Sequence, residues 1–588
     1  MSACFLNHRK CAAQRQEPPT SVGGVVDPLG AVAAGDRHAH GATNFETEDG
    51  LEMAAGRRPP VGAESAQHIL AVDLGTGGPK VALASTDGEI IGHEFEKTDL
   101  LLLPGGGAEQ DPDDWWRAIA TAAKRLLGRG LVPADSIVGI SLTTQWMGTV
   151  AVDRDGNHLM NAIIWMDTRG AAYAKRITKG LVNVAGYGAT KLRRWLKLTG
   201  GVPSRTGKDS LGHILFIQNE HPDIYRQAFK FLEPMDYLNM RLTGQAAAAY
   251  DTITGHWLTD NRDLSNVRYV DELIALSGVD REKLPDLRPT GAILGPITAE
   301  IAREFGLRED VQVVMGTPDT ESAAVGSGAV RDFEAHLYIG TSSWLTCHVP
   351  FKKTDVINSI TSLPSGIPGR YLVATEQDTA GACLTLLRDN IFFPDDELSG
   401  GAAPDDTLEI FNRMAERVPA GSDKLIFTPW LNGERTPVEN HLIRGGFFNQ
   451  SLTTTRAHLI RAVFEGVAYN TRWMHQHVEK FVKKRLDGIN FIGGGANSSL
   501  WCQIHADVLD RTIRQVENPG LANVHGAALI GAVALGHITF DDVPQRVTIT
   551  GTYQPNPDNK RIYDELFDEF VNIYKNNKQT YARLNATA

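Results

Sequence analysis

The stretch "HILAVDLGTGGPKVALAS" (residues 68–85) indicates how the folded part of this chain begins. Residues 69–72 form an apolar run typical of a buried strand, and residues 80–85 form a second strand after a turn of Gly and Thr. Glycine-rich turns can hold phosphate, but this spacing does not match the P-loop pattern G-x-x-x-x-G-K-[ST]. A phosphate at this turn would therefore need another arrangement of backbone N–H groups and hydroxyls.

The residues that follow predict a mixed α/β layer. "EIIGHEF" (89–95) comes after a turn at Asp87-Gly88, so residues 68–95 are expected to form an antiparallel meander. "DPDDWWRAIATAAKRLLGRG" (111–130) predicts a helix capped by Asp111, and "SIVGISLTT" (136–144) predicts a further strand. Residues 170–300 are expected to be rich in helix and to end in Pro-rich turns at 284–298.

The strand–turn–strand pattern of residues 68–85 occurs a second time. "EAHLYIGTSSWLTCHV" (334–349) again gives an apolar strand, Gly-Thr, two small residues and a strand, about 265 residues after the first copy. One such turn alone is best explained as a tight hairpin. Two matched turns predict two related domains whose turns face each other across a cleft, with backbone N–H groups available to an anion.

Composition limits the classes of function. The chain has 588 residues and a net charge of −12, which suits two large domains and argues against broad nucleic-acid or anionic-membrane binding. Its five cysteines are scattered, which favours a reducing compartment, so a cytoplasmic location is expected. Residues 1–65 lack any sustained period and are predicted to be a disordered extension or an over-extended start of translation, with a transit peptide as the less favoured alternative.

Two carboxylates are candidates for chemistry. Asp73 lies on a predicted buried strand and needs a partner, either a hydrated Mg²⁺ or a structural ion pair. Asp319 follows the strand predicted at 311–318, where it is either a helix cap or a general base that takes a proton from a substrate hydroxyl. Lys80 is either a phosphate contact or a surface lysine. The residues expected to hold nucleotide phosphates are Gly75, Thr76, Lys80, Gly340, Thr341 and Ser342.

Other candidates stand at the ends of predicted strands. Trp and Met are more often core residues than ligand contacts, and an Asp and an Arg two residues apart can simply pair with one another. The candidates for contact with a substrate are Gln145, Trp146, Met147, Asp167, Arg169 and Asp319. "FIGGGANSS" (491–499) also ends a strand before a helix, and a loop or helix cap is the simpler interpretation of its glycines.

Five motifs, taken in order, make the chain resemble the FGGY carbohydrate kinases over nearly nine-tenths of its length. They are "AVDLGTGGPKVAL" (71–83), "MGTPDTESAAVGSG" (315–328), "LYIGTSSWL" (337–345), "PWLNGERTPVENHLIRGGFFN" (429–449) with "LIRAVFEGVAYNTR" (459–472), and "IGGGANSSLWCQIHADVL" (492–509). The resemblance implies an α/β fold of two duplicated domains, of the actin/hexokinase/Hsp70-like (ribonuclease H-like) type, around a central cleft. It places the FGGY N-terminal domain at 66–331 and the C-terminal domain at 332–588.

The resemblance also implies the cofactors and the roles of residues. ATP and Mg²⁺ are expected, with Asp73 and Asp319 near the metal and the γ-phosphate, and with Asp319 activating the attacking hydroxyl. The residues expected at the adenosine are Gly493, Gly494, Gly495 and Asn497. The implied reaction transfers the γ-phosphate to a hydroxyl of a small sugar or polyol, and a homodimer is an expected assembly.

One departure bears on the substrate. Xylulokinases, the nearest members, carry Q-M-H-G where this chain has Gln145-Trp146-Met147-Gly148, so a thioether replaces an imidazole that donates or accepts a hydrogen bond. Asp319 is also followed by Thr320, where Asn or Gln is common in the family. D-xylulose is the single best expectation for the substrate. The alternatives are another pentulose, a hexulose or a polyol, an inactive paralogue, or a non-catalytic, nucleotide-gated binding module on the same fold.

Overall fold

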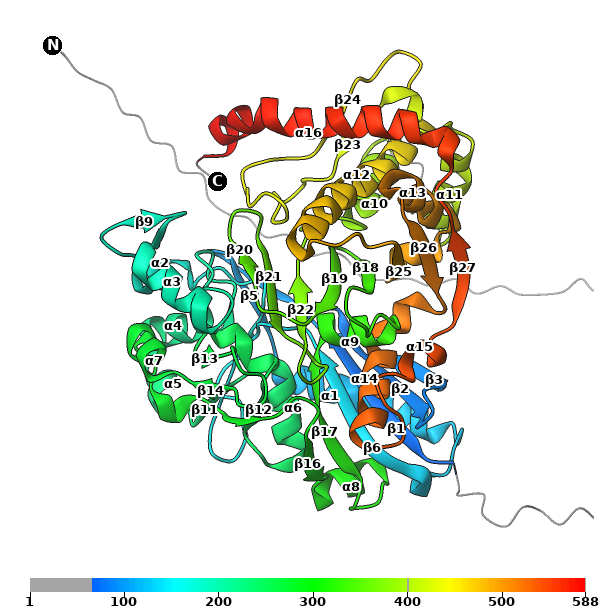
Figure 1. The fold of residues 1–588 in the computed structure, drawn as a ribbon. Helices are drawn as coiled ribbons and strands as arrows, with labels where there is room; N and C mark the ends of the chain where they lie inside the picture. The colour runs from blue at the N-terminus through cyan, green and yellow to red at the C-terminus, as the bar shows by residue number, and fades with distance from the viewer. Residues whose placement is uncertain (1–65, 399–400, 587–588) are drawn as a thin grey trace, which may run out of the picture. The chain divides into compact units, whose positions relative to one another are not determined.

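The computed structural model describes residues 66–398 and 401–586, so the predicted extension at 1–65 lies outside the described residues. Two large sheets dominate this part of the chain, one of six strands and one of eight strands. Figure 1 shows both. Within the described residues, no helix combines the length and the apolar character needed to cross a bilayer.

The first sheet confirms the predicted meander. β1 (His68–Gly75), β2 (Gly78–Ser85) and β3 (Ile90–Phe95) are antiparallel neighbours. β6 (Ile137–Thr144) is parallel to β1, β17 (Gln312–Pro318) is parallel to β6, and β16 (Ile293–Pro296) is the antiparallel edge. The sheet order is therefore β16-β17-β6-β1-β2-β3.

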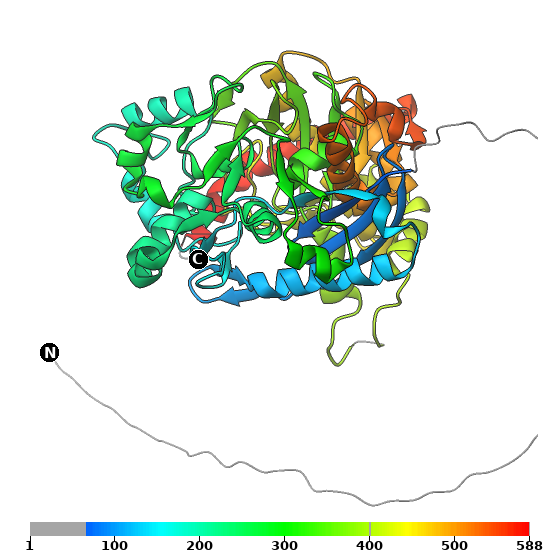
Figure 2. The same ribbon diagram turned by 90° about the horizontal axis from the view of Figure 1, so that it is seen from below.

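The alternation of side chains along β1 explains how both faces of this sheet are covered. Leu70 and Val72 pack in one cluster with Trp115 of α1 (Pro112–Gly128), whose first turn is capped by Asp111 as predicted. Ala71 points to the opposite face, where it packs with small residues of α14 (Ala522–Ala534). Because successive side chains of a strand alternate, one apolar run serves two helices. Figure 2 shows α1 running along the first sheet.

The second sheet repeats the order of the first. β18 (Ala335–Ile339) pairs antiparallel with β19 (Ser343–Val349) and parallel with β25 (Gly488–Ile492), as β1 does with β2 and β6. β26 (Thr512–Val516) lies parallel to β25, and β27 (Ile549–Tyr553) closes this side as an antiparallel edge. β22 (Tyr371–Ala374), β21 (Ile360–Pro364) and β20 (Thr354–Asp355) extend the other side. The shared order confirms the duplication that the two turns predicted.

Two helices of small residues pack closely between these sheets. α9 (Asp319–Gly326) follows β17, and α14 follows β26. A Cβ at Gly326 would lie 1.8 Å from the carbonyl oxygen of Ala522, and one at Gly526 would lie 1.9 Å from that of Ser322. Only glycine allows this approach, which brings a C-terminal helix against the first sheet.

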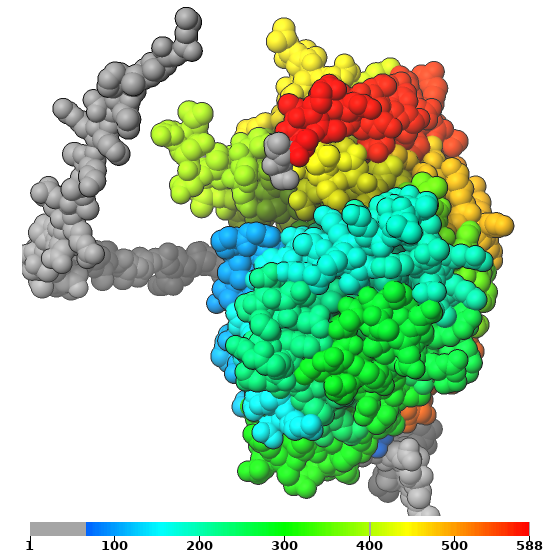
Figure 3. All heavy atoms as spheres, turned by 90° about the vertical axis from the view of Figure 1, so that its left-hand side faces the viewer, coloured from blue at the N-terminus to red at the C-terminus, as the bar shows by residue number. Residues whose placement is uncertain are grey.

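The segment between β6 and β17 is rich in helix, as predicted, and forms the lower part of the face shown in Figure 3, below the yellow and red C-terminal elements. Its helices are α2 (Ala171–Thr178), α3 (Ala189–Leu198), α4 (Ser210–Glu220), α5 (Pro222–Gln227), α6 (Pro234–Thr243), α7 (Asp271–Ser277) and α8 (Ala299–Phe305). The turns predicted at 284–298 are instead partly strands, β15 (Asp286–Arg288) and β16, because each finds a neighbouring strand to pair with.

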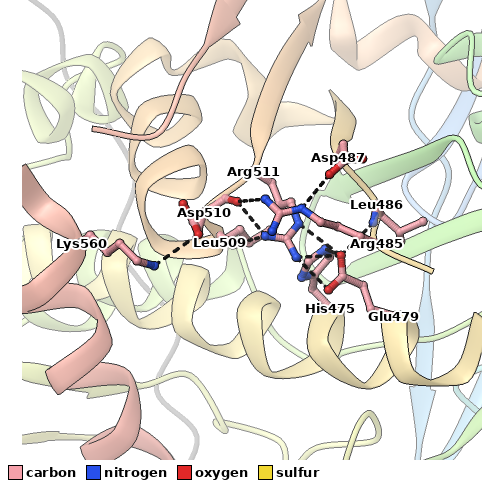
Figure 4. Close-up of polar contacts among 9 residues, drawn as sticks. All are labelled: His475, Glu479, Arg485, Leu486, Asp487, Leu509, Asp510, Arg511 and Lys560. Carbon is pink, nitrogen blue, oxygen red and sulfur yellow. Dashed lines mark hydrogen bonds and ion pairs between the residues drawn. The ribbon is translucent and has the colours of Figure 1, made fainter. Parts of the chain in front are cut away.

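Long helices complete the C-terminal half. They are α12 (Arg456–Val482), α13 (Ser499–Leu509) and α16 (Pro557–Asn585). Near the end of α12, Glu479 accepts hydrogen bonds from Arg511 Nε at 3.1 Å, from Arg511 Nη2 at 2.8 Å, and from the Leu486 N–H (Figure 4). Burial alone would raise the pKa of Glu479, but hydrogen bonds from His475 and Arg511 hold it at about 2. This network fastens α12 to the segments that lead into β25 and β26.

Candidate active site

The turn between β1 and β2 carries the first candidate residues. Asp73 and Lys80 are opposite one another in the register of this hairpin, and Lys80 Nζ donates to Asp73 Oδ2 at 3.4 Å. Asp73 is 3% exposed, and burial raises the pKa of its carboxyl against the opposing effect of Lys80. Gly78 has φ 132°, and a Cβ there would lie 2.0 Å from the carbonyl oxygen of Glu96, so the turn requires glycine at this position.

Asp319 lies at the same edge of the first sheet as Asp73. β1, β6 and β17 are parallel neighbours, so their carboxyl ends meet at one edge, which is where open α/β sheets bind ligands. Asp319 is the first residue of α9 and accepts the N–H of Thr320 at 2.8 Å. Burial first, and then the charge of Asp73, raises the pKa of Asp319 to about 7. A carboxylate with such a pKa suits a general base near neutral pH.

The turn between β18 and β19 is fixed by the chain that leads into α10 (Ala382–Leu386). The carbonyl oxygen of Gly340 accepts the N–H of Gly381 at 2.9 Å, and that of Thr341 accepts the N–H of Ala380 at 2.9 Å. These bonds occupy carbonyl oxygens of the turn and leave the exposed side chain of Thr341 outward. Within the turn, the Gly340 N–H donates to the carbonyl oxygen of Ser342 at 2.9 Å.

Tyr338 connects the second hairpin with the two carboxylates. Its ring stacks on Trp344 with centroids 3.9 Å apart, and its hydroxyl would lie 2.5 Å from a Cβ at Gly340. Burial raises the pKa of Tyr338, and the charges of Asp73 and Asp319 raise it further. Because these charges act on one phenol beside Gly340, the structure brings the second turn and both carboxylates into one electrostatic environment.

A polar network that the sequence did not reveal surrounds Thr76. The Thr76 hydroxyl donates to Gln145 Oε1 at 3.1 Å and accepts Trp165 Nε1–H at 3.1 Å. Gln145 Nε2 donates to Gln110 Oε1 at 2.7 Å, and Gln110 Nε2 donates to the carbonyl oxygen of Thr76 at 2.9 Å. The Thr76 hydroxyl therefore serves the protein itself. Gln110 is fully buried and was missed from the sequence.

The residues after Gln145 are held by a buried carboxyl. Trp146 Nε1 donates to the carbonyl oxygen of Thr252 at 3.0 Å, and Met147 has φ 58°, a conformation that side chains other than Gly rarely adopt. The next N–H, of Gly148, donates to Glu233 Oε2 at 3.0 Å. Burial raises the pKa of Glu233 to about 8, against the hydrogen bonds from Ser210 and Gly148. Glu233 was also missed from the sequence.

Asp167 and Arg169 are brought together by the structure. Arg169 Nε donates to Asp167 Oδ2 at 2.8 Å, and Arg169 Nη2 lies 2.6 Å from Glu109 Oε1. Asp167 also accepts the N–H of Ala108 at 2.9 Å and is fully buried. The sequence left open whether the two residues pair or bind a substrate, and in this structure they pair.

The glycine turn expected at the adenosine lies against the second hairpin. Gly493 has φ 84°, and a Cβ there would lie 2.5 Å from the carbonyl oxygen of Ile339, the last residue of β18. A Cβ at Gly495 would lie 2.7 Å from the Ile339 side chain, whereas Gly494 faces open space. Asn497 Nδ2 donates to the carbonyl oxygen of Gly494 at 3.2 Å. The turn is thus placed beside the Gly340 turn, with one side uncovered.

The pair of Asp73 and Asp319 fits a hydrated divalent cation. Each carboxyl has its pKa raised, and a cation between two such groups would relieve both the burial and the mutual repulsion. Mg²⁺ commonly takes one or two carboxylates and keeps several waters. In the described part of the chain, the three-residue cluster with metal-ligand spacing is Asp111, Asp113 and His158, at the start of α1. That cluster contains neither of the two carboxylates.

Comparisons with known proteins agree with this arrangement. Residues 68–326 match the model described as "FGGY family of carbohydrate kinases, N-terminal domain", and residues 335–535 match that of the C-terminal domain. A xylulose kinase of Bacillus subtilis is 26% identical over 87% of this chain and 97% of its own length. A gluconokinase of Bacillus licheniformis is 26% identical over 88% and 97%. The crystal structure of gluconate kinase from Lactobacillus acidophilus, 23% identical, covers 88% of this chain and 100% of its own with a TM-score of 0.77, which supports the fold.

Proposed function

Because this chain belongs to the FGGY family of carbohydrate kinases and is accordingly an ATP-dependent sugar kinase, we propose that it transfers the γ-phosphate of ATP to a hydroxyl of D-xylulose. Another pentulose, a hexulose or a polyol is the alternative acceptor. Gluconate belongs in the same comparison, since similar proteins are named gluconokinase as well as xylulose kinase.

The observation that carries the catalytic part of the proposal is the carboxyl of Asp319. Its pKa of about 7 and its partly exposed side chain at the end of β17 suit a group that takes the proton from the attacking hydroxyl. The alkoxide character that develops on that oxygen attacks the γ-phosphorus, the bond to the β-phosphate oxygen breaks, and Asp319 keeps the proton. Phosphoryl transfer otherwise needs positioning and neutralisation of charge.

The other expected residues hold the nucleotide in this proposal. Asp73 would hold Mg²⁺, which supplies positive charge to the phosphates when it is bound. Lys80 is paired with Asp73, but its side chain is 34% exposed and would turn to a phosphate that binds beside it. Backbone N–H groups of the turns at Gly75 and Gly340 would contact the phosphates, and the uncovered side of the glycine turn at Gly494 would take the adenosine.

The acceptor sugar is proposed to lie over the network of Thr76, Gln145 and Trp165. Met147 stands where xylulokinases carry His, so one hydrogen bond to the sugar would be missing and a hydroxyl there would meet a thioether. The turn that carries Met147 is held by the bond from the Gly148 N–H to Glu233. We therefore expect Met147 to change which sugar is preferred and not to abolish sugar binding. The sugar that is preferred, and its orientation at Asp319, would decide which hydroxyl is phosphorylated.

Further expectations from the sequence belong to the proposal. They are the division at residue 331 into two FGGY domains, a homodimer, a cytoplasmic location and the absence of a nucleic-acid partner. The net charge of −12 and the free, buried thiols of Cys347, Cys383 and Cys502 support the last two.

The test is release of ADP by the purified full chain across a panel of sugars. The panel contains D-xylulose, other pentuloses, hexuloses, polyols and gluconate, each with ATP and Mg²⁺. We expect release that depends on the sugar and is highest with D-xylulose. A higher kcat/KM with another member overturns the choice of acceptor. A slow rate that no member stimulates overturns the kinase and favours a nucleotide-gated module or an inactive paralogue.

A further inference from the structure

A groove separate from the carboxylates of the candidate site lies between α3 and the start of β20. Its volume is about 480 Å³, within the usual range for small-molecule sites. One wall comes from the helix-rich segment and the other from the edge of the second sheet, and the two lie on the same side of the molecule in Figure 1. The residues that line it are Val184, Ala189, Leu192, Arg193, Leu196, Lys197, Lys352, Lys353 and Thr354.

The charge of this groove is entirely positive. Its lining contains Arg193, Lys197, Lys352 and Lys353 and no Asp or Glu, although acidic residues outnumber basic ones in the chain, 70 to 58. Arg193 and Lys197 are exposed, and neither has an ion-pair partner among residues 66–398 and 401–586. They are four residues apart on α3, so their charges repel one another along one helix face. An anion in the groove would remove that repulsion.

The opposite wall presents cations that are already fixed in place. Lys352 Nζ donates to the carbonyl oxygen of Leu196 at 2.7 Å, in the last turn of α3, and burial lowers the pKa of Lys352 to about 8. Lys353 Nζ donates to the carbonyl oxygen of Phe481 at 2.5 Å and lies 4.5 Å from the centroid of its ring. An ammonium group has three donors, so each retains donors for a ligand. Ordering these side chains on binding would cost little entropy, because they are already held.

The remaining lining is apolar. Val184, Ala189, Leu192 and Leu196 contribute side chains without donors or acceptors, on the α3 side of the groove. A bare inorganic anion would leave this apolar surface without a contact, and the volume of the groove exceeds what one such ion needs. A phosphate group linked to a carbon skeleton would use both the cations and the apolar surface.

We propose that this groove binds a small organic phosphate, a phosphate monoester on a sugar-sized carbon skeleton, with its phosphate between α3 and the Lys352–Lys353 segment. The ligand would contact both the helix-rich segment and the edge of the second sheet, and it would be recognised apart from the substrate site. The proposal concerns binding and does not depend on which sugar is phosphorylated.

Lysine footprinting tests the proposal on the full chain without confusing the two sites. The protein is acetylated with and without D-xylulose 5-phosphate as the probe, and modification of each lysine is quantified by mass spectrometry. We expect the probe to slow acetylation of Lys197 and Lys352 at least fivefold while the exposed Lys124, on α1, is unchanged. Unchanged rates at Lys197 and Lys352 with the probe at millimolar concentration overturn the proposal.

Two further arms make the result specific. Arg193→Gln combined with Lys197→Gln should raise the probe concentration that protects Lys352 at least tenfold while sugar-dependent ADP release is kept, and Arg303→Gln on α8 is the matched control. Protection of Lys352 that survives the double substitution contradicts the proposed contacts. Inorganic phosphate should protect more weakly than the probe, and equal protection by both contradicts the assignment of an organic ligand.

Discussion

Glu233 is expected to make the stability of this enzyme fall as pH rises. Its carboxyl is 1% exposed, accepts the Gly148 N–H and the Ser210 hydroxyl, and lies beside the turn that carries Met147. Burial raises the pKa of Glu233 from 4.5 to about 8. The folded protein therefore keeps this group neutral in a range where the unfolded chain ionises it. Glu233→Gln keeps the shape and the acceptor oxygen but removes the titration.

The size of the effect follows from the two pKa values. A group whose pKa is raised on folding contributes its full stabilisation of the folded state below the pKa that it has in the unfolded chain. That contribution is lost as pH rises through the pKa that it has in the folded protein. For Glu233 the window runs from 4.5 to about 8. Inside it, each pH unit costs about 1.4 kcal/mol, so about 2.7 kcal/mol is lost over two pH units. Asp251, also buried with a raised pKa, remains in both proteins and largely cancels in the difference.

The assay is urea unfolding of wild type and Glu233→Gln at about pH 5.5 and about pH 7.5, followed by the difference in free energy of unfolding at each pH. Between these two pH values, the free energy of unfolding of the variant relative to that of the wild type should rise by about 2.7 kcal/mol. Glu300→Gln, at an exposed position of α8, is the control and should show no such change. A difference for Glu233→Gln that stays level with pH refutes the reasoning.

Three other predictions concern the candidate site and the fold. Thr76→Val should lower the free energy of unfolding by about 1–3 kcal/mol, because Gln145 and Trp165 lose a partner, whereas Thr76→Ser should keep it; equal losses in urea unfolding would contradict this. Chelation by EDTA should abolish sugar-dependent ADP release, and added Mg²⁺ should restore it; activity that survives chelation would contradict the metal role. Glu479→Gln should cost up to about 3 kcal/mol near neutral pH, because His475 and Arg511 hold the pKa of Glu479 at about 2 and this stabilises the fold above pH 4.5; the deficit measured by urea unfolding should shrink as pH falls below that value.

The sequence predicted the fold where local pattern and tertiary structure agree. The apolar runs at 69–72 and 335–339 are strands in sheets of the same order, because each must be buried on two faces and the Gly-Thr turn leaves one way to pair them. The position of α14 against the first sheet was not predictable. It depends on the approach of Gly326 and Gly526, which are 200 positions apart in the chain and carry no local signal.

The candidate site was predictable in part for the same reason. Asp73 and Asp319 stand at strand ends, where turn chemistry and charge are visible in the sequence, and the charge of one acts on the other in the structure. Gln110, Trp165 and Glu233 were missed, because a residue that holds another residue in place shows only through a contact between distant segments.

The most direct test of the central claim compares Asp319→Asn with the wild type in sugar-dependent ADP release. Asp271→Asn is the matched control, since Asp271 opens α7 as Asp319 opens α9 but is exposed. Loss of a general base should lower kcat by about 10²–10⁴-fold, while the unfolding transition is kept. A folded Asp319→Asn enzyme that turns over within about threefold of wild type, the range of an ordinary surface change, would contradict the claim that this carboxylate takes the proton of the acceptor hydroxyl.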